Sequence, residues 1–267
     1  MTRGTDRTSR AAGMLAGLLL TLCGAIPARA QSGPPPALAM DEKWHFVVAP
    51  YFWGSGISGS ISIGNFVTVP IDASFSDVMK NFDFGLMGRF EGRKGRFGFS
   101  SDLLYINLGA PLKGNVAGQL DANVDVRQLI FEGVGFYRAY HGGRADNPAF
   151  VDVLAGARYY GTKTRLQSSL EDSEAKTVDW VDAVAGVRFH APLGARFSLL
   201  GRGDIAGFGS ELTWTLEGDL AARLGERWLV GAGWKHLDIE YDQSDGTRRK
   251  LLDIAYDGPR FWAAYSW

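Results

Sequence analysis

From about residue 44 to the C-terminus, apolar and polar positions alternate with a period of two. Val181, Val187 and Phe189 fall on one face of an extended segment, whereas Asp182 and Arg188 fall on the other. This alternation is typical of β-strands that have one apolar and one polar face. The same pattern, interrupted by turn residues, predicts strands at 44–56, 82–93, 96–109, 121–140, 149–167, 176–191, 196–209, 212–224, 227–242 and 248–267. We therefore expect an all-β fold with about ten strands.

The breaks between these strands differ in length and polarity. Short breaks occur at "RKGR" (93–96), "APLGAR" (191–196) and "LGER" (224–227). Longer or more polar breaks occur at 54–81, 110–120, 168–176 and 242–247. Short turns at one end and longer loops at the other are the layout of outer-membrane β-barrels. An even number of strands places both termini at the short-turn end, which is expected to face the periplasm.

Residues 1–30 have the organisation of a secretory signal peptide. The start is basic, residues 11–26 are almost entirely apolar, and the small residues of "PARA" follow. The Pro-rich segment 31–43 has no periodicity and is predicted to be flexible. Cys23, the single cysteine, lies in the signal peptide, so the exported chain has no disulfide to stabilise it. Residues 44–267 remain for the barrel.

Composition leaves two classes of exported protein. The net charge of -1 gives no electrostatic reason to expect a nucleic-acid partner. Beyond the signal peptide, no stretch approaches the roughly 20 apolar residues of a transmembrane helix. A chain with 35 glycines and 12% aromatic residues is then either a soluble secreted β protein or a transmembrane β-barrel. Both classes have two-faced strands, because a soluble sandwich also has one apolar face.

Aromatic residues near the strand ends favour the transmembrane class. Trp and Tyr prefer the headgroup region of a bilayer, because they combine an apolar body with a polar tip. The alternative explanation is that strands favour aromatic residues in any protein. The residues predicted to form aromatic girdles are Trp44, Tyr51, Trp53, Tyr105, Tyr137, Tyr140, Tyr159, Tyr160, Trp180, Trp214, Trp228, Tyr241, Tyr256, Tyr265 and Trp267.

The chain ends in "FWAAYSW", an aromatic segment in strand register. Phe261, Tyr265 and Trp267 fall on one face and are predicted to face lipid, with Trp267 at the periplasmic interface. A closing strand that ends in an aromatic residue resembles the signal that the barrel-assembly machinery reads in bacterial outer membranes. Arg260 matches the polar start of that signal, whereas Trp262 stands where glycine is usual. We therefore predict a transmembrane antiparallel up-and-down barrel of about ten strands, with eight or twelve as alternatives.

Three segments carry a resemblance to known barrels. The stretches 74–108, 180–209 and 233–242 include "FDFGLMGRFEGRKGRFGFSSDLLYINL" and "GWKHLDIEYD". They resemble parts of a widespread family of small proteobacterial outer-membrane β-barrels, which has no assigned reaction. The resemblance implies an integral protein of the Gram-negative outer membrane that contacts its lipids. It names no solute, ligand or oligomeric state.

Charged residues recur on the strand face opposite the apolar one, which is the predicted lumen face. The acids are Asp83, Glu91, Asp102, Glu132, Asp152, Asp182, Asp204, Glu217 and Asp219, and the bases are Arg89, Arg138, Arg158, Arg188, Arg202, Lys235 and Arg260. A narrow barrel cannot hold such charges unpaired, because their desolvation cost is large. They are therefore expected to form an ion-pair network that fills the barrel. The alternative is a porin-like polar conduit for small solutes.

No segment has the residues of a known catalytic, nucleotide-binding or metal-binding motif. His236 is the best catalytic candidate, because Asp238 and Glu240 share its strand face. Without further partners, it is predicted to be a lumen or interface residue. We expect no enzyme activity, cofactor or metal. An enzyme that acts on lipid or peptide at the barrel rim, and a protein that binds partners through its loops, are the alternatives.

The longest predicted break, 54–81, contains structure of its own. "ISGSISIGNFVTVPI" is predicted to form a hairpin around Gly64 and Asn65. "SFSDVMKNF" predicts a short helix capped by Ser76 or Asp77. This element is expected either to extend the barrel mouth or to fold over the lumen as a lid.

Overall fold

A computed structural model describes residues 38–63, 67–113, 121–144, 146–168, 175–244 and 249–267. All of them belong to one compact unit, Gly33–Trp267. The predicted signal peptide, most of the predicted flexible segment and the predicted hairpin turn at Gly64 and Asn65 lie outside the described residues. Within the described ranges, no helix is long and apolar enough to cross a membrane.

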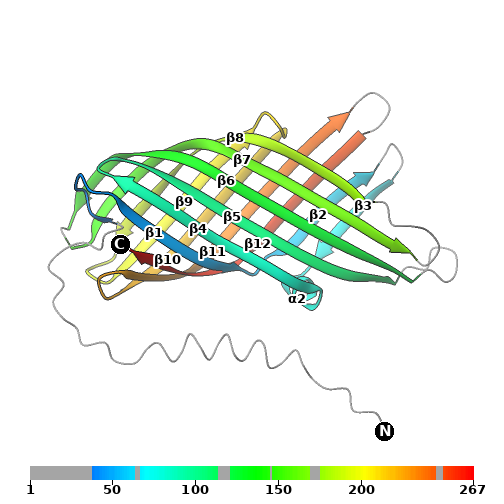
Figure 1. Cartoon of the computed structure of the whole chain (residues 1–267), viewed down its shortest axis with the longest axis horizontal. Coiled ribbons are helices and arrows are strands. Elements are labelled where there is room, and N and C mark those ends of the chain that lie inside the picture. Colours follow the sequence, from blue (N-terminus) through cyan, green and yellow to red (C-terminus); the bar gives the residue numbers. More distant parts are fainter. Residues whose placement is uncertain (1–37, 64–66, 114–120, 145, 169–174, 245–248) are drawn as a thin grey trace, which may run out of the picture. The chain divides into compact units, whose positions relative to one another are not determined.

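Ten of the twelve strands in the described part of the chain close into an antiparallel barrel. The elements are β1 (His45–Trp53), β2 (Gly56–Ile63), β3 (Val67–Ala73), α2 (Phe75–Lys80), β4 (Phe82–Lys94), β5 (Phe97–Lys113), β6 (Asp121–Gly143), β7 (Pro148–Ser168), β8 (Ala175–Pro192), β9 (Phe197–Gly207), β10 (Leu212–Leu224), β11 (Trp228–Ser244) and β12 (Arg249–Ser266). Neighbours pair in the order β1-β4-β5-β6-β7-β8-β9-β10-β11-β12, and β12 pairs with β1 to close the wall (Figure 1). The closing register sets Val47 opposite Ser266 and Phe52 opposite Phe261. The predicted up-and-down barrel is confirmed, with strand limits that agree within a few residues.

The two remaining strands, β2 and β3, continue the barrel wall. β12 pairs with β1 through its C-terminal half and with β2 through its N-terminal half, so β2 extends the line of β1 beyond Gly54. Gly258 on β12 permits this close passage, because a Cβ there would lie 2.1 Å from the carbonyl oxygen of Gly54. β2 and β3 form the predicted hairpin. Its pairing with β12 favours the extended mouth over the lid.

The short helix α2 leads from this hairpin into β4. Its N-cap is Ser74, whose hydroxyl oxygen accepts a hydrogen bond from the backbone N–H of Asp77 at 3.3 Å. The same hydroxyl donates to the Asp77 carboxylate at 2.6 Å. The predicted cap at Ser76 or Asp77 is wrong. Ser74 and Asp77 have the spacing of a reciprocal capping pair, so the helix begins two residues earlier than a cap at Ser76 allows.

The two faces of the strands differ as predicted. Outward side chains are apolar and exposed, as in Val181 at 55% and Ile205 at 62%. Inward side chains are charged and buried, as in Arg138 and Asp152, both at 0%. Soluble proteins bury their apolar face and expose their charges. The reversed distribution seen here is that of a transmembrane β-barrel.

Part of the predicted aromatic girdle lies inside the barrel instead. The inward residues are Tyr51, Trp53, Tyr160, Trp180, Tyr241 and Tyr256. The predicted girdle residues that are well exposed on the outer wall are Trp44, Tyr137, Tyr140, Trp214, Trp228 and Trp267. Nearness to a strand end does not decide the side of the wall. The two-residue period decides it, and the inward set occupies lumen positions.

Candidate functional site

The predicted lumen charges stand in two cross-strand rows on the inner wall. The first row, on β4 to β8, consists of directly opposed residues Arg89, Asp102, Glu132, Arg158 and Asp182. The second row, on β6 to β11, consists of Arg138, Asp152, Arg188, Arg202, Glu217 and Lys235. Beside the rows lie Glu91, Asp204, Asp219 and Arg260. Every predicted lumen charge except Asp83 therefore faces the interior.

Two carboxylates and two guanidiniums form a closed cluster in the middle of the lumen. Arg158 lies 2.5 Å from Glu132 and 2.6 Å from Asp204. Arg202 contacts the same two carboxylates, each at 2.8 Å. All four side chains are nearly inaccessible to solvent, the most exposed at 7%. The opposite charges neutralise one another at hydrogen-bond distance, which offsets the cost of removing them from water.

A second cluster lies toward the short-turn end. Asp152 accepts hydrogen bonds from Arg138 at 2.8 Å and from Arg188 at 3.0 Å. Arg188 also donates to Glu91 at 2.5 Å. The Arg138 guanidinium lies 3.7 Å from the ring centroid of Phe150, a cation–π contact. Because β4 carries Glu91 and β8 carries Arg188, this ion pair crosses the lumen.

Glu217 is the centre of a third cluster and faces three cations. Arg89 and Lys235 each lie 3.3 Å from its carboxylate, and Arg260 lies 2.7 Å from it. Arg89 also donates to Asp102 at 2.9 Å. β4 and β10 lie nearly half a turn apart in the strand order, so the pair of Arg89 and Glu217 is a second bridge across the lumen.

Asp182 is inside the barrel, but its partners are neutral. Its oxygens accept hydrogen bonds from the backbone N–H groups of Gly209 and Ser210 at 3.0 and 2.7 Å, and from the Ser210 hydroxyl at 2.8 Å. The Trp180 indole donates to it at 3.1 Å. These bonds hold the turn between β9 and β10, where Phe208 has a φ of 85° and is 99% exposed. Several N–H and O–H donors satisfy a buried carboxylate without a cation.

Two charged residues lie elsewhere than the sequence indicates. Arg93, assigned to a turn by its sequence context, is 1% exposed, and its guanidinium lies 3.8 Å from the sulfur of Met40. Arg93 follows Glu91 by two residues and therefore shares its strand face. This spacing could have predicted that Arg93 points inward. Asp83, predicted to face the lumen, is exposed at the start of β4. The register between β4 and β5 shifts at this point, so the alternation does not extend to Asp83.

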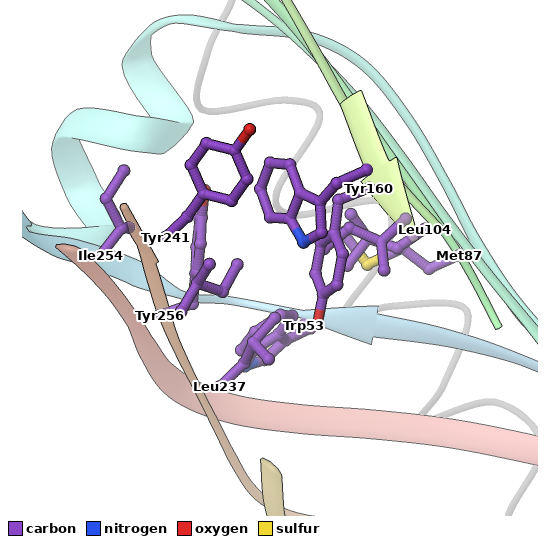
Figure 2. Packing of buried hydrophobic residues seen from close by; sticks show 11 residues of the cluster. Trp53, Met87, Leu104, Tyr160, Leu237, Tyr241, Ile254 and Tyr256 are labelled. Atoms are coloured by element: carbon purple, nitrogen blue, oxygen red, sulfur yellow. The ribbon is translucent and has the colours of Figure 1, made fainter. Parts of the chain in front are cut away.

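Aromatic side chains fill the half of the lumen nearer the long loops, where a polar interior was expected. Trp53, Tyr160, Trp180, Tyr241 and Tyr256, here called the aromatic seal, are each at most 8% exposed. Ring centroids lie 4.8 Å apart between Tyr160 and Trp180 and 4.5 Å apart between Trp180 and Tyr241. Figure 2 shows Tyr241 and Tyr256 on one side of the cluster and Tyr160 on the other. The seal therefore joins β7 and β8 to β11 and β12 across the lumen.

The charge network and the seal leave small internal spaces. A cavity of about 20 Å³ lies among Asp102, Glu132 and Arg158. A larger cavity of about 170 Å³, here called the short-turn chamber, lies between the network and the end of the barrel where β1 begins. Leu38, from the segment before β1, lines this chamber and is 5% exposed.

His236 was predicted to lie either in the lumen or at the interface. It lies on the outer wall, which excludes the lumen and agrees with the interface. Its Nδ1 is 3.0 Å from Asp257, and its ring centroid is 4.5 Å from that of Trp214. Asp238 is more distant, at 3.9 Å from Nε2, and Glu240 is exposed. Among the described residues, no group of three or more His, Cys, Asp and Glu side chains has the geometry of a metal site.

Comparison with solved structures finds matches at low sequence identity. Ail, the attachment invasion locus protein of Yersinia pestis, in complex with the heparin analogue sucrose octasulfate, is 10% identical with a TM-score of 0.37, covering 85% of this chain and 99% of that one. The translocator domain of the autotransporter NalP from Neisseria meningitidis is 13% identical with a TM-score of 0.41, covering 97% of both chains. A Pseudomonas aeruginosa FadL homologue is 10% identical with a TM-score of 0.29, covering 88% and 92%. No protein-family model and no curated protein matches the sequence.

Proposed function

We propose that the chain is an integral protein of the bacterial outer membrane whose lumen is sealed, and that it serves the cell envelope as a structural barrel rather than as an open porin. The observation that carries this proposal is the pair of ionic bridges across the lumen. Arg89 on β4 contacts Glu217 on β10, and Glu91 on β4 contacts Arg188 on β8. Side chains that join opposite walls block the path that a solute would need.

The energetics of the bridges support a sealed lumen. Barrels of about eight strands are filled by their own side chains, and two more strands add little width. Opening a path would separate buried charges from their partners, at a cost of roughly several kcal/mol per ion. The aromatic seal adds a second, apolar block above the charge network. Both would have to move before a polar solute could pass.

The outer wall supports the location in a membrane. Phe261 and Trp267 of the closing strand face outward and are 49% and 47% exposed. The backbone of Trp267 exchanges two hydrogen bonds with that of Phe46, at 3.0 and 3.1 Å, which extends the pairing of β1 and β12 to the end of the chain. An unpaired strand edge would be costly in hydrocarbon. Membrane lipids are thus the partners of this wall, and the barrel-assembly machinery is the partner of the strand containing Phe261, Tyr265 and Trp267.

We assign no catalytic role to His236 or to the lumen carboxylates. His236 contacts Asp257 and Trp214 on the outer wall. The lumen carboxylates that could act as acids or bases are engaged in ion pairs with arginines or lysine, or accept several hydrogen bonds.

Conductance in planar lipid bilayers tests the proposal. Refolded wild-type protein is expected to insert without steady current, whereas a Trp180→Ala/Glu217→Ala double variant, which weakens both blocks, is expected to show channel events. A shift in gel mobility on boiling establishes that each sample is folded. Steady open-channel current from folded wild-type protein would contradict the sealed lumen and favour the porin-like alternative.

A further inference from the structure

β9 and β10 are shorter than the strands on either side of them. β8 pairs with β7 as far as Ala175, but with β9 only as far as Ala183, which lies opposite Gly207. β11 likewise pairs with β12 as far as Ser244, but with β10 only as far as Glu240. The turn between β9 and β10 therefore lies short of the ends of β8 and β11, and the wall has a notch at the long-loop end.

One side of this notch is a strand edge without a ladder partner. The turn after β9 folds against the start of the edge, because a Cβ at Gly209 would lie 2.2 Å from the carbonyl oxygen of Val181. Beyond that point, residues 175–180 of β8 pair with β7 on one side and, within the described part of the chain, with no strand on the other. We call this stretch the β8 edge. Its outward side chains Thr177 and Asp179 are exposed.

The β8 edge lies outside the hydrocarbon of the membrane. Open sheet edges do not occur in lipid, because no water is present there to satisfy their N–H and C=O groups. A transmembrane strand needs about 9–11 residues. β9 and β10, with 11 and 13 residues, are therefore long enough to cross the bilayer without the β8 edge. The edge faces water at the long-loop end, where a partner can reach it.

The other free strand edges among the described residues carry features that disfavour pairing. β3 contains Pro70, and residues 109–113 of β5, beyond the pairing with β4, contain Pro111. Proline has no N–H to donate to a ladder. Residues 82–87 of β4 extend beyond the pairing with β1, and their register with β5 shifts. On β11, residues 241–244 leave only a very short edge. The β8 edge has no proline, and its register with β7 is continuous.

The same barrel shows how such an edge can be extended. β2 continues the line of β1, because it pairs with the part of β12 that lies beyond the pairing with β1. A strand added to the β8 edge would continue the line of β9 in the same way. In this mode of recognition, main-chain hydrogen bonds supply the affinity and alternate side chains supply the specificity.

Side chains around the notch determine which sequence such a strand would need. On the inner face, Val178 and Trp180 belong to the apolar packing of the aromatic seal. On the outer face, Asp179 on the edge, Glu211 in the turn and Glu240 on β11 are exposed acids. An added strand would therefore need apolar residues on its inner face and basic residues on its outer face.

The outer face keeps this preference when its cation is included. On the neighbouring strand β7, Lys163 lies opposite Thr177 and supplies one positive charge against the three acids. Opposite charges on adjacent strands are stabilising. We propose that the β8 edge binds an extended segment of a partner protein in which basic residues alternate with apolar residues.

Binding of a model peptide to the refolded mature chain in phosphatidylcholine nanodiscs tests this proposal. The probe is fluorescein-labelled Lys-Val-Lys-Val-Lys-Val-Lys, and fluorescence anisotropy is expected to show saturable binding. The matched peptide with proline in place of the central valine has the same charge but interrupts the ladder, so it is expected to bind about tenfold more weakly. Replacing every lysine of the probe with glutamate is expected to abolish binding. Empty nanodiscs report the background.

Hydrogen exchange and charge reversal locate the bound peptide. Amides of residues 176–180 are expected to exchange several-fold more slowly when the peptide is bound. Asp179→Lys is expected to weaken binding by about three- to tenfold, because an attractive cross-strand pair becomes a repulsive one. Asp253→Lys makes the same charge change on β12, at the same end of the barrel, and is expected to bind like wild type.

Proline variants test the backbone of the edge directly. Successive residues of a strand direct their N–H groups to opposite sides, so either Thr177→Pro or Val178→Pro removes an N–H from the free side. That variant is expected to fold and to lose binding. Gel mobility before and after boiling shows which variants fold. If neither proline variant folds, the peptide series and Asp179→Lys still decide the question.

Four results would overturn the proposal. The first is the absence of saturable binding to wild-type protein. The second is equal affinity for the proline-interrupted peptide, which would show attraction by charge alone. The third is unchanged binding by folded Asp179→Lys. The fourth is a dimer whose residues 176–180 are already protected without peptide, which would make a second copy the occupant. None of these results bears on conductance, so the sealed-lumen proposal is tested separately.

Discussion

Arg89 and Glu217 are 128 residues apart in the sequence, yet one guanidinium nitrogen of Arg89 lies 3.3 Å from both carboxylate oxygens of Glu217. The contact joins β4 to β10 across the lumen. Lys235 and Arg260 approach the same carboxylate. Glu217 is therefore shared by three cations in a space that solvent hardly reaches, while Asp102 and Asp219 supply further negative charge to Arg89 and Arg260.

Replacing Glu217 is expected to be strongly destabilising. Glu217→Ala leaves buried cations without their shared partner, which typically costs about 3–5 kcal/mol in the free energy of unfolding. Urea unfolding of the refolded protein in detergent measures this loss. Glu226→Ala, in the exposed turn between β10 and β11, is the control and should change stability by less than about 0.5 kcal/mol. Equal stability of the two variants would show that the bridge across the lumen is dispensable.

Cations placed on the outer wall are expected to prevent folding in lipid. Val153→Arg and Ala185→Arg each direct a charge toward the bilayer, at a cost of about 2–4 kcal/mol near the midplane. Leu193→Arg, in the exposed turn between β8 and β9, is the control and should fold normally. The fraction that migrates as folded protein on unheated gels measures folding. If both wall variants fold while Arg158→Val does not, the wall does not face hydrocarbon.

Deleting Trp267 is expected to affect assembly in cells more than stability in detergent. Trp267 ends the pairing with Phe46, and its ring lies on the outer wall 5.9 Å from that of Phe46. The loss of one terminal residue removes few contacts, but it truncates the strand that the assembly machinery is expected to recognise. Amounts of assembled protein in outer-membrane fractions, compared with urea midpoints of refolded protein, measure the two effects. Trp267→Phe should assemble nearly normally, and equal losses in both assays would make Trp267 a packing residue only.

The helix α2 is expected to lose order at acid pH. Hydrogen bonds from the Ser74 hydroxyl and from Lys80 lower the pKa of Asp77 below its ordinary value. Because the folded-state pKa is depressed, the contribution of Asp77 is present above the unfolded-state pKa and is lost as pH falls through the folded-state pKa. Backbone amide shifts of residues 75–80 during an acid titration follow this change. Asp77→Asn should abolish the titration, and an unchanged profile in that variant would assign it to another group.

The architecture of the barrel could be predicted from the sequence because its signal is local. Each strand shows the two-residue period in its own residues, as with Val181 and Asp182, and the short turns separate strands that pair as neighbours. The period also indicates which charges share a face. This is why nearly all the charged lining of the lumen could be named before its partners were known.

Which residue each lumen side chain contacts depends on closure of the barrel. Arg89 meets Glu217 only when the strands from β4 to β12 and β1 have all taken their registers, and no local pattern encodes that distance. The same holds for the stack of Trp180 on Tyr241, whose position near strand ends suggested a lipid-facing girdle. It also holds for Asp182, which faces the lumen as the period requires but accepts hydrogen bonds from the turn after β9. A strand's own sequence sets the two directions of its side chains, whereas what each direction meets depends on the strands that come to lie across the lumen.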